Sequence, residues 1–441
     1  MDSLLSAKTV NNSYNIIPPQ TIQITQPKKV VSKTAYAINI MNAIGTTIFE
    51  TLYQYLAIFL GSAGIIQGLI TSIRHLENAL LNPLWGRLSD KFGRKRFLIV
   101  GNFFLGINAI LVPNAPNLYL LFLLIIIQTI LNAMVIPTWS GYLGDITSKT
   151  IARRGAVLGR IGMITTLLSN FLLVFILFFI DGLDPNRVSM RVLEIPFYIG
   201  SITYFLAFAL SFKLPTLKDR KTPTKTFPKF DYNKLTFPKP YVRLVILDSL
   251  FTIAWSIAWP LFPYVNFSVA NTWFEIGLLA LFSAIFTAIG QNFSGTLIDK
   301  FGKPNLIIFG RFWVILPPLF YIMSIITNNI IFIFISNIVV GLASGATGIV
   351  ITTHILDNAP EENRSTYQAL YLMITGLSAF VGSTIMGILL QVFSGNKIPS
   401  NNVLIILFLF ASTLRCFTWF GFFFLKESKI NKSNVTDLLV P

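Results

Sequence analysis

Gly86-Arg-Leu-Ser-Asp90-Lys-Phe-Gly93-Arg94-Lys95 is a basic, glycine-punctuated stretch that returns 209 residues later as Gly295-Thr-Leu-Ile-Asp299-Lys-Phe-Gly302-Lys303. Each copy stands between two long apolar runs. A self-similarity at this distance indicates that the chain contains two related halves. The apolar runs on either side of each copy indicate that the stretch is a short loop between two membrane-spanning helices.

The composition supports a membrane protein. Of the 441 residues, 54% are hydrophobic, only 12% are charged and 40 are Phe, which exceeds what a soluble domain needs. A helix needs about 20 apolar residues to cross the hydrocarbon core of a bilayer. Twelve such runs are predicted: 35–60, 63–85, 97–114, 118–143, 156–180, 194–212, 242–265, 273–294, 305–327, 329–355, 367–392 and 401–425. The predicted fold is an all-α integral membrane protein of twelve transmembrane helices in two pseudo-symmetric six-helix halves.

The basic residues follow this topology. The net charge of +16 could suggest nucleic acid, yet 27 of the 34 Lys and Arg fall in the tails and in alternate loops, as the positive-inside rule requires for cytoplasmic segments. We therefore predict a multi-pass protein of the cell membrane with cytoplasmic termini and no nucleic-acid partner. The single cysteine, Cys416, excludes an intrachain disulfide and a cysteine metal site.

The predicted domain organisation follows from the same runs. A cytoplasmic tail, 1–34, precedes the first six-helix half, 35–212. A polar, Pro-rich cytoplasmic linker follows at 213–241 and carries eight Lys or Arg. The second half, 242–426, ends in a short tail, 427–441. The linker is long enough to let the halves move relative to each other, as alternating access requires.

The repeated loop resembles the signature loop of the major facilitator superfamily, over about residues 35 to 425. The resemblance implies a secondary transporter in which spans one, four, seven and ten surround a central cavity. It also implies a cytoplasmic gate, in which the Asp of the loop caps a neighbouring helix and the Arg pairs with an acid at the end of span four. The matching positions here are Gly86, Asp90, Gly93, Arg94, Lys95 and Asp145, with Gly295, Asp299 and Gly302 in the second copy.

These charges are expected to tie the halves shut on the cytoplasmic side in one state and to separate in the other. The second loop departs from the family pattern because Pro304 stands where another basic residue is usual, so its latch should be weaker. The alternative is that the charges only set the topology.

Ionisable residues inside the predicted spans are the candidates for proton coupling: Glu50, Arg74, Glu77 and Asp248. Such charges are expensive in a bilayer and usually face a cavity or a partner. Arg74 and Glu77 are three residues apart and are expected to pair, which would leave Glu50 free to titrate. A buried structural ion network is the alternative for the first three residues, and a partner for Arg311 or Arg415 is the alternative for Asp248.

Polar and aromatic residues recur at helical spacing on several spans, as expected for helices that line a cavity. The candidates for substrate contact are Asn42, Gln54, Gln128, Asn132, Trp139, Trp255, Trp259 and Asn337. Each Trp could stack on a ring or bind a cation through its π face. Packing or interfacial anchoring is the alternative for each Trp.

The sequence offers little for an enzyme. It has no phosphate-binding loop of the GxxxxGK[ST] type, no HExxH and no GxSxG, so neither an ATP-driven pump nor a hydrolase is indicated, and no cofactor is predicted. We expect a monomeric secondary transporter of a small molecule in the lipid bilayer, coupled to protons. Efflux of lipophilic or cationic compounds is favoured, although two markers of drug-proton antiporters are absent from spans four and five. Uptake or exchange of an organic anion or another metabolite is the alternative, and a non-transporting receptor or scaffold is the alternative of another class.

Overall fold

The computed structural model describes residues 33–146, 154–183, 190–215, 237–360 and 364–425. Every regular element in these residues is a helix. The first half contains α1 (Lys33–Phe59), α2 (Gly64–Phe92), α3 (Arg94–Leu111), α4 (Leu118–Ile146), α5 (Arg154–Leu183), a 3-10 turn (Met190–Leu193) and α6 (Glu194–Ser211). The second half contains α7 (Lys239–Ser256), α8 (Phe262–Val269), α9 (Trp273–Phe301), α10 (Lys303–Trp313), α11 (Pro317–Thr327), α12 (Ile331–Asn358), α13 (Arg364–Ser394), α14 (Asn401–Phe420) and a 3-10 turn (Gly421–Phe424).

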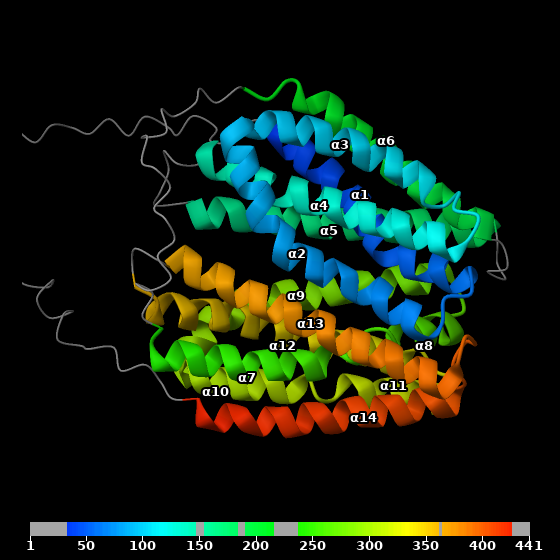
Figure 1. The fold of residues 1–441 in the computed structure, drawn as a ribbon, viewed down its shortest axis with the longest axis vertical. Coiled ribbons are helices and arrows are strands. Elements are labelled where there is room, and N and C mark those ends of the chain that lie inside the picture. Colours follow the sequence, from blue (N-terminus) through cyan, green and yellow to red (C-terminus); the bar gives the residue numbers. More distant parts are fainter. Residues whose placement is uncertain (1–32, 147–153, 184–189, 216–236, 361–363, 426–441) are drawn as a thin grey trace, which may run out of the picture.

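The helices run along a common direction, and the two halves lie against each other along that direction (Figure 1). Eight segments of the described chain are long and apolar enough to cross a membrane by themselves. They and the remaining helices account for the twelve predicted spans, and the all-α fold in two six-helix halves is confirmed. The predicted tails and the linker fall almost entirely outside the described residues.

Two of the predicted spans are broken, and the prediction of one continuous helix for each was wrong. The run 242–265 forms α7 and α8, and the run 305–327 forms α10 and α11. Pro260 follows the end of α7, and Pro317 and Pro318 follow the end of α10. Proline lacks the N–H that would continue the helical hydrogen bonds, and its ring clashes with the carbonyl four residues earlier.

The hydrophobic core shows how the halves meet. We call the end of the bundle where α6 ends and α7 begins the linker end, and the opposite end the far end. At the far end a single apolar cluster includes residues of both halves, such as Leu177 and Trp273. At the linker end the core separates into two clusters, one around Leu98 in the first half and one around Leu306 in the second. The halves therefore share a core at the far end and have separate cores at the linker end.

The closest contact between the halves runs along α2 and α13. Gly68 and Gly387 face each other there, and a Cβ added at Gly387 would lie 2.9 Å from the Cα of Gly68. Gly376 packs in the same way against Ala79 of α2. Small residues at such positions let two helix backbones approach closely.

Candidate functional site

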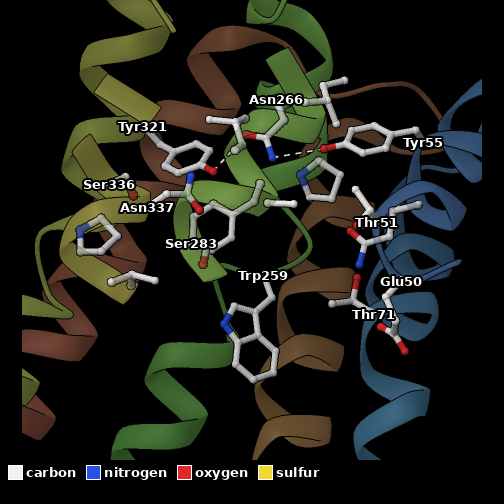
Figure 2. A pocket seen from close by; sticks show the side chains of 18 of the residues that line it. Glu50, Thr51, Tyr55, Thr71, Trp259, Asn266, Ser283, Tyr321, Ser336 and Asn337 are labelled. Atoms are coloured by element: carbon white, nitrogen blue, oxygen red, sulfur yellow. Dashed lines mark hydrogen bonds between the residues drawn. The ribbon is translucent and has the colours of Figure 1, made fainter. Parts of the chain in front are cut away.

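A cavity of about 670 Å³ lies between the two halves. Its wall in the first half comes from α1 and α2, and its wall in the second half comes from the break between α7 and α8 and from α9, α11 and α12. Figure 2 shows Glu50, Thr51 and Thr71 on one side and Tyr321, Ser336 and Asn337 on the other. Of the predicted site residues, six line this cavity: Glu50, Gln54, Arg74, Trp255, Trp259 and Asn337.

Glu50 and Arg74 form an ion pair in the cavity wall, between α1 and α2. The predicted pair of Arg74 with Glu77 is therefore wrong, although the two residues are close along α2. Arg74 lies on the cavity side of α2, with 33% of its side chain exposed, and reaches Glu50 on the facing helix. Glu77 is 7% exposed, is absent from the cavity lining, and its Oε2 makes no hydrogen bond to a described residue.

Aromatic and amide groups close the cavity toward the far end. Asn266 of α8 donates from Nδ2 to the Tyr55 hydroxyl at 3.3 Å, and its Oδ1 accepts from the Tyr321 hydroxyl at 2.9 Å. This chain of side chains connects α1 in one half with α11 in the other, as Figure 2 shows. Sequence reasoning missed all three residues, although an Asn inside the apolar segment of α8 was a usable signal.

Trp259 joins the break in span seven to the first half. Its ring lies 4.6 Å from the ring of His75 on α2, between centroids, and 5.6 Å from the ring of Trp255. The cavity therefore has an aromatic floor that crosses the boundary between the halves. His75 was not predicted as a site residue, since a single His on an apolar helix is not a specific signal.

Asp248 belongs to a separate buried network in the second half. Arg311 Nη2 lies 2.5 Å from Asp248 Oδ1, and the Tyr371 hydroxyl donates to Asp248 Oδ2 at 2.6 Å. Asp248 and Arg311 are 1% and 4% exposed, and the Arg311 guanidinium lies over the rings of Phe251 and Trp255. Asp248 is thus the partner of Arg311, the alternative reading of the sequence, and it does not line the cavity.

Four predicted cavity residues of the first half lie outside the cavity lining: Asn42, Gln128, Asn132 and Trp139. Gln128 accepts a hydrogen bond from Asn108 at 2.8 Å inside the first half, and the Trp139 ring stacks on Tyr142. Helical periodicity assigns a residue to a face of its helix, but it does not give the depth at which that face borders a cavity.

The repeated loop makes its described contacts within each half. Arg94 pairs with Asp90 one turn earlier, with Nη2 2.6 Å from Oδ1. The Arg94 guanidinium also packs against Gly141 of α4, four residues before Asp145, whose side chain lies outside the described residues. Lys95 donates to the carbonyls of Phe212 and Leu214, each at 2.7 Å.

The second copy repeats this arrangement. Lys303 forms an ion pair with Asp357 near the end of α12. Gly93 and Gly302 have φ of +97° and +75°, a conformation that favours glycine at the turn. Gly86 and Gly295 face open space, and Asp299 is exposed.

At the far end, Asp181 connects the two halves. The last turn of α5 places its carboxylate at the start of α9, where Oδ1 accepts from Trp273 N and Oδ2 from Phe274 N, each at 2.7 Å. A carboxylate at a helix N-terminus satisfies unpaired amides and complements the helix dipole. Sequence reasoning missed Asp181, and the capping pattern Thr272-x-x-Glu275 was the available signal for a helix start beside it.

Comparison with known proteins agrees with this architecture. The family profile of the Major Facilitator Superfamily matches residues 35–247 and again 244–438. An uncharacterized MFS-type transporter, MJ1560 of Methanocaldococcus jannaschii, is 25% identical over 76% of this chain and 84% of its own length. The quinolone resistance protein NorA of Staphylococcus aureus is 24% identical over 76% of this chain and 83% of its own length. Among solved structures, the nucleoside transporter NupG superposes with a TM-score of 0.69 at 16% identity, covering 90% of this chain and all of that one.

Proposed function

This chain belongs to the major facilitator superfamily of membrane transporters, and we propose that it exports lipophilic cations from the cell in exchange for protons. The Glu50–Arg74 ion pair in the cavity wall carries the proposal, because it places a titratable carboxylate where a solute would bind. The likeness to a quinolone resistance protein supports export. The aromatic floor around Trp255 and Trp259 suits flat apolar compounds and cations.

The coupling follows from the charges of the pair. When Glu50 is ionised, it neutralises Arg74, and the cavity accepts a cationic solute. When Glu50 takes up a proton, the Arg74 charge is no longer compensated by its partner and repels a cation. Proton binding and cation binding therefore oppose each other, which is the requirement for exchange across a membrane.

Alternating access requires the halves to rock about the cavity. The shared core at the far end and the separate cores at the linker end describe a state that opens toward the linker end. The positive-inside distribution of Lys and Arg assigns the linker end to the cytoplasm. The structure is then the inward-facing state, in which a cytoplasmic solute enters.

Replacement of Glu50 by Gln tests the proposal. In proteoliposomes with an imposed pH gradient, the wild type should accumulate ethidium, whereas E50Q should not accumulate it because position 50 no longer titrates. E50Q should still bind ethidium through the aromatic floor, without the loss of affinity at acid pH expected of the wild type. E275Q, which changes a carboxylate at the start of α9 outside the cavity, is the control. Unchanged pH-driven accumulation in E50Q would refute the role of Glu50.

Transport of an organic anion is a second candidate, and Arg415 favours it. This buried guanidinium borders the cavity and makes no ion pair with a described residue, so its charge attracts anions. Thermal unfolding of the purified protein with panels of cations and anions distinguishes the two. A ligand at about 100 times its dissociation constant adds roughly 2.7 kcal/mol to stability. Stabilisation by anions alone would replace cation export with anion transport.

A further inference from the structure

The breaks in spans seven and nine leave backbone carbonyls without their usual helical partners. Before Pro260, the amide of Trp259 bonds to the Ser256 carbonyl at 3.1 Å instead of the Trp255 carbonyl. In span nine, the residues three and four positions after Val314 are Pro317 and Pro318, which have no N–H to offer its carbonyl. Unpaired carbonyls inside a bilayer cost several kcal/mol each, so other donors must satisfy them.

Arg415 of α14 supplies these donors at both breaks. Its Nη2 donates to the Trp255 carbonyl at 2.7 Å and its Nη1 to the Val314 carbonyl at 2.9 Å, while its Nε lies 3.4 Å from the Ala254 carbonyl. The side chain is 0% exposed. A guanidinium has several donors in a fixed plane, which lets one side chain bond to two separate backbone segments.

Neighbouring residues of α14 support span nine alone. The Ser412 hydroxyl donates to the Ile315 carbonyl at 3.4 Å, and Trp419 Nε1 donates to the Ile308 carbonyl at 2.8 Å. With Arg415, these residues follow a spacing of three and seven positions and occupy one face of α14. Of the three, only Arg415 also reaches span seven.

We propose that Arg415 is the positioning residue of the cavity. It replaces the amide hydrogens that are missing at the two proline breaks and thereby holds the broken ends of spans seven and nine together. Those ends carry cavity walls from both spans, with Trp255 and Trp259 at one break and Pro317 and Tyr321 at the other. The proposal concerns the shape of the cavity and does not depend on which solute is transported or on proton coupling.

Hydrogen exchange of the intact protein in detergent tests this assignment. In R415M, peptides that cover residues 257–261 and 315–316 should exchange about tenfold faster or more, because both breaks lose a charged donor. Peptides from the first half should keep the wild-type rate. T413V is the matched control, because Thr413 is on the exposed side of α14 and bonds only to the Leu409 carbonyl of its own helix.

A second substitution makes the test selective. P318A returns an N–H four residues after Val314, so R415M/P318A should regain protection at the break in span nine and stay unprotected at the break in span seven. A general destabilisation by loss of a buried charge would not give this split. If R415M yields no folded protein, R415K replaces it, since a single ammonium cannot occupy both positions of the guanidinium, and faster exchange at either break is expected.

Three results would overturn the proposal. The first is wild-type exchange at both breaks in R415M or R415K. The second is a uniform increase over all helices. The third is failure of P318A to restore span nine in the R415M background.

Discussion

At the residue scale, Trp259 connects the chemistry of the cavity to the boundary between the halves. Its ring lines the cavity, contacts His75 of the first half and packs edge-on against Trp255. Glu50 and Arg74 lie in the same cavity wall, so an aromatic surface and an ion pair face the same space. A flat cation would meet a π face and a titratable carboxylate together.

Replacing Trp259 by Ala should weaken binding of ethidium by about 2- to 30-fold, which corresponds to a cation–π contribution of roughly 0.5–2 kcal/mol. W259F should retain most of the affinity because a ring remains. W139F, in the core of the first half, should bind like the wild type. Fluorescence titration of the purified variants measures this, and equal affinities for W259A and the wild type would contradict a contact between Trp259 and the solute.

Asp248 gives a prediction about stability. D248N leaves the Arg311 charge buried without its carboxylate, and breaking such a pair typically costs about 3–5 kcal/mol. We expect a clearly lower unfolding temperature for D248N, and a smaller loss for D248L/R311M, in which no charge remains. Thermal unfolding in detergent gives both values. A double variant that is as unstable as D248N would mean that the pair does more than neutralise charge.

At the scale of the elements, α2 and α13 form the contact along which the halves meet, and glycines set its separation. In G387A, the new Cβ would lie 2.9 Å from the Gly68 Cα and 3.1 Å from the Ile65 carbonyl oxygen, so the helices must move apart. We expect a lower unfolding temperature, with an overpacking cost of about 1–3 kcal/mol. G348A on α12 is the control, because a Cβ there meets open space and Ala favours a helix over Gly. Equal stability of the two variants would show that the contact is loose.

At the scale of the whole molecule, the two ends of the bundle use charges differently in this state. At the linker end, the described ion pairs Asp90–Arg94 and Lys303–Asp357 each lie within one half. At the far end, Asp181 bonds across the halves to the first amides of α9. Charges thus hold the far end closed and leave the linker end without a described ionic bond between halves.

D181A should shift the population toward a state that is open at the far end, because an N-terminal capping interaction is worth about 0.5–2 kcal/mol and this one joins the halves. Spin labels at Asn117 and Lys397, two exposed far-end positions in different halves, would report a longer mean distance in a C416S background. E275Q is the control, since Glu275 bonds to Asn271 within the second half. An unchanged distance distribution in D181A would rule out Asp181 as a latch.

The sequence by itself determined the twelve spans, the duplication of the halves and the cavity face of several helices. Hydropathy and helical period are local properties, so Glu50, Arg74, Trp255 and Trp259 were predicted on the cavity side of their helices, where the structure has them. The glycines of the repeated loop were predictable for the same reason, since the turn between two helices depends on neighbouring residues.

Only the tertiary structure decided which charges pair and which backbone groups need help. Arg74 pairs with Glu50 on another helix and not with nearby Glu77, because the packing of α1 against α2 sets the shortest path between charges. Arg415 and Asp181 bond to backbone groups more than 90 residues away. Prolines mark where a helix breaks, but the donor that satisfies the freed carbonyl comes from a helix that is remote in the chain, and local sequence holds no record of that contact.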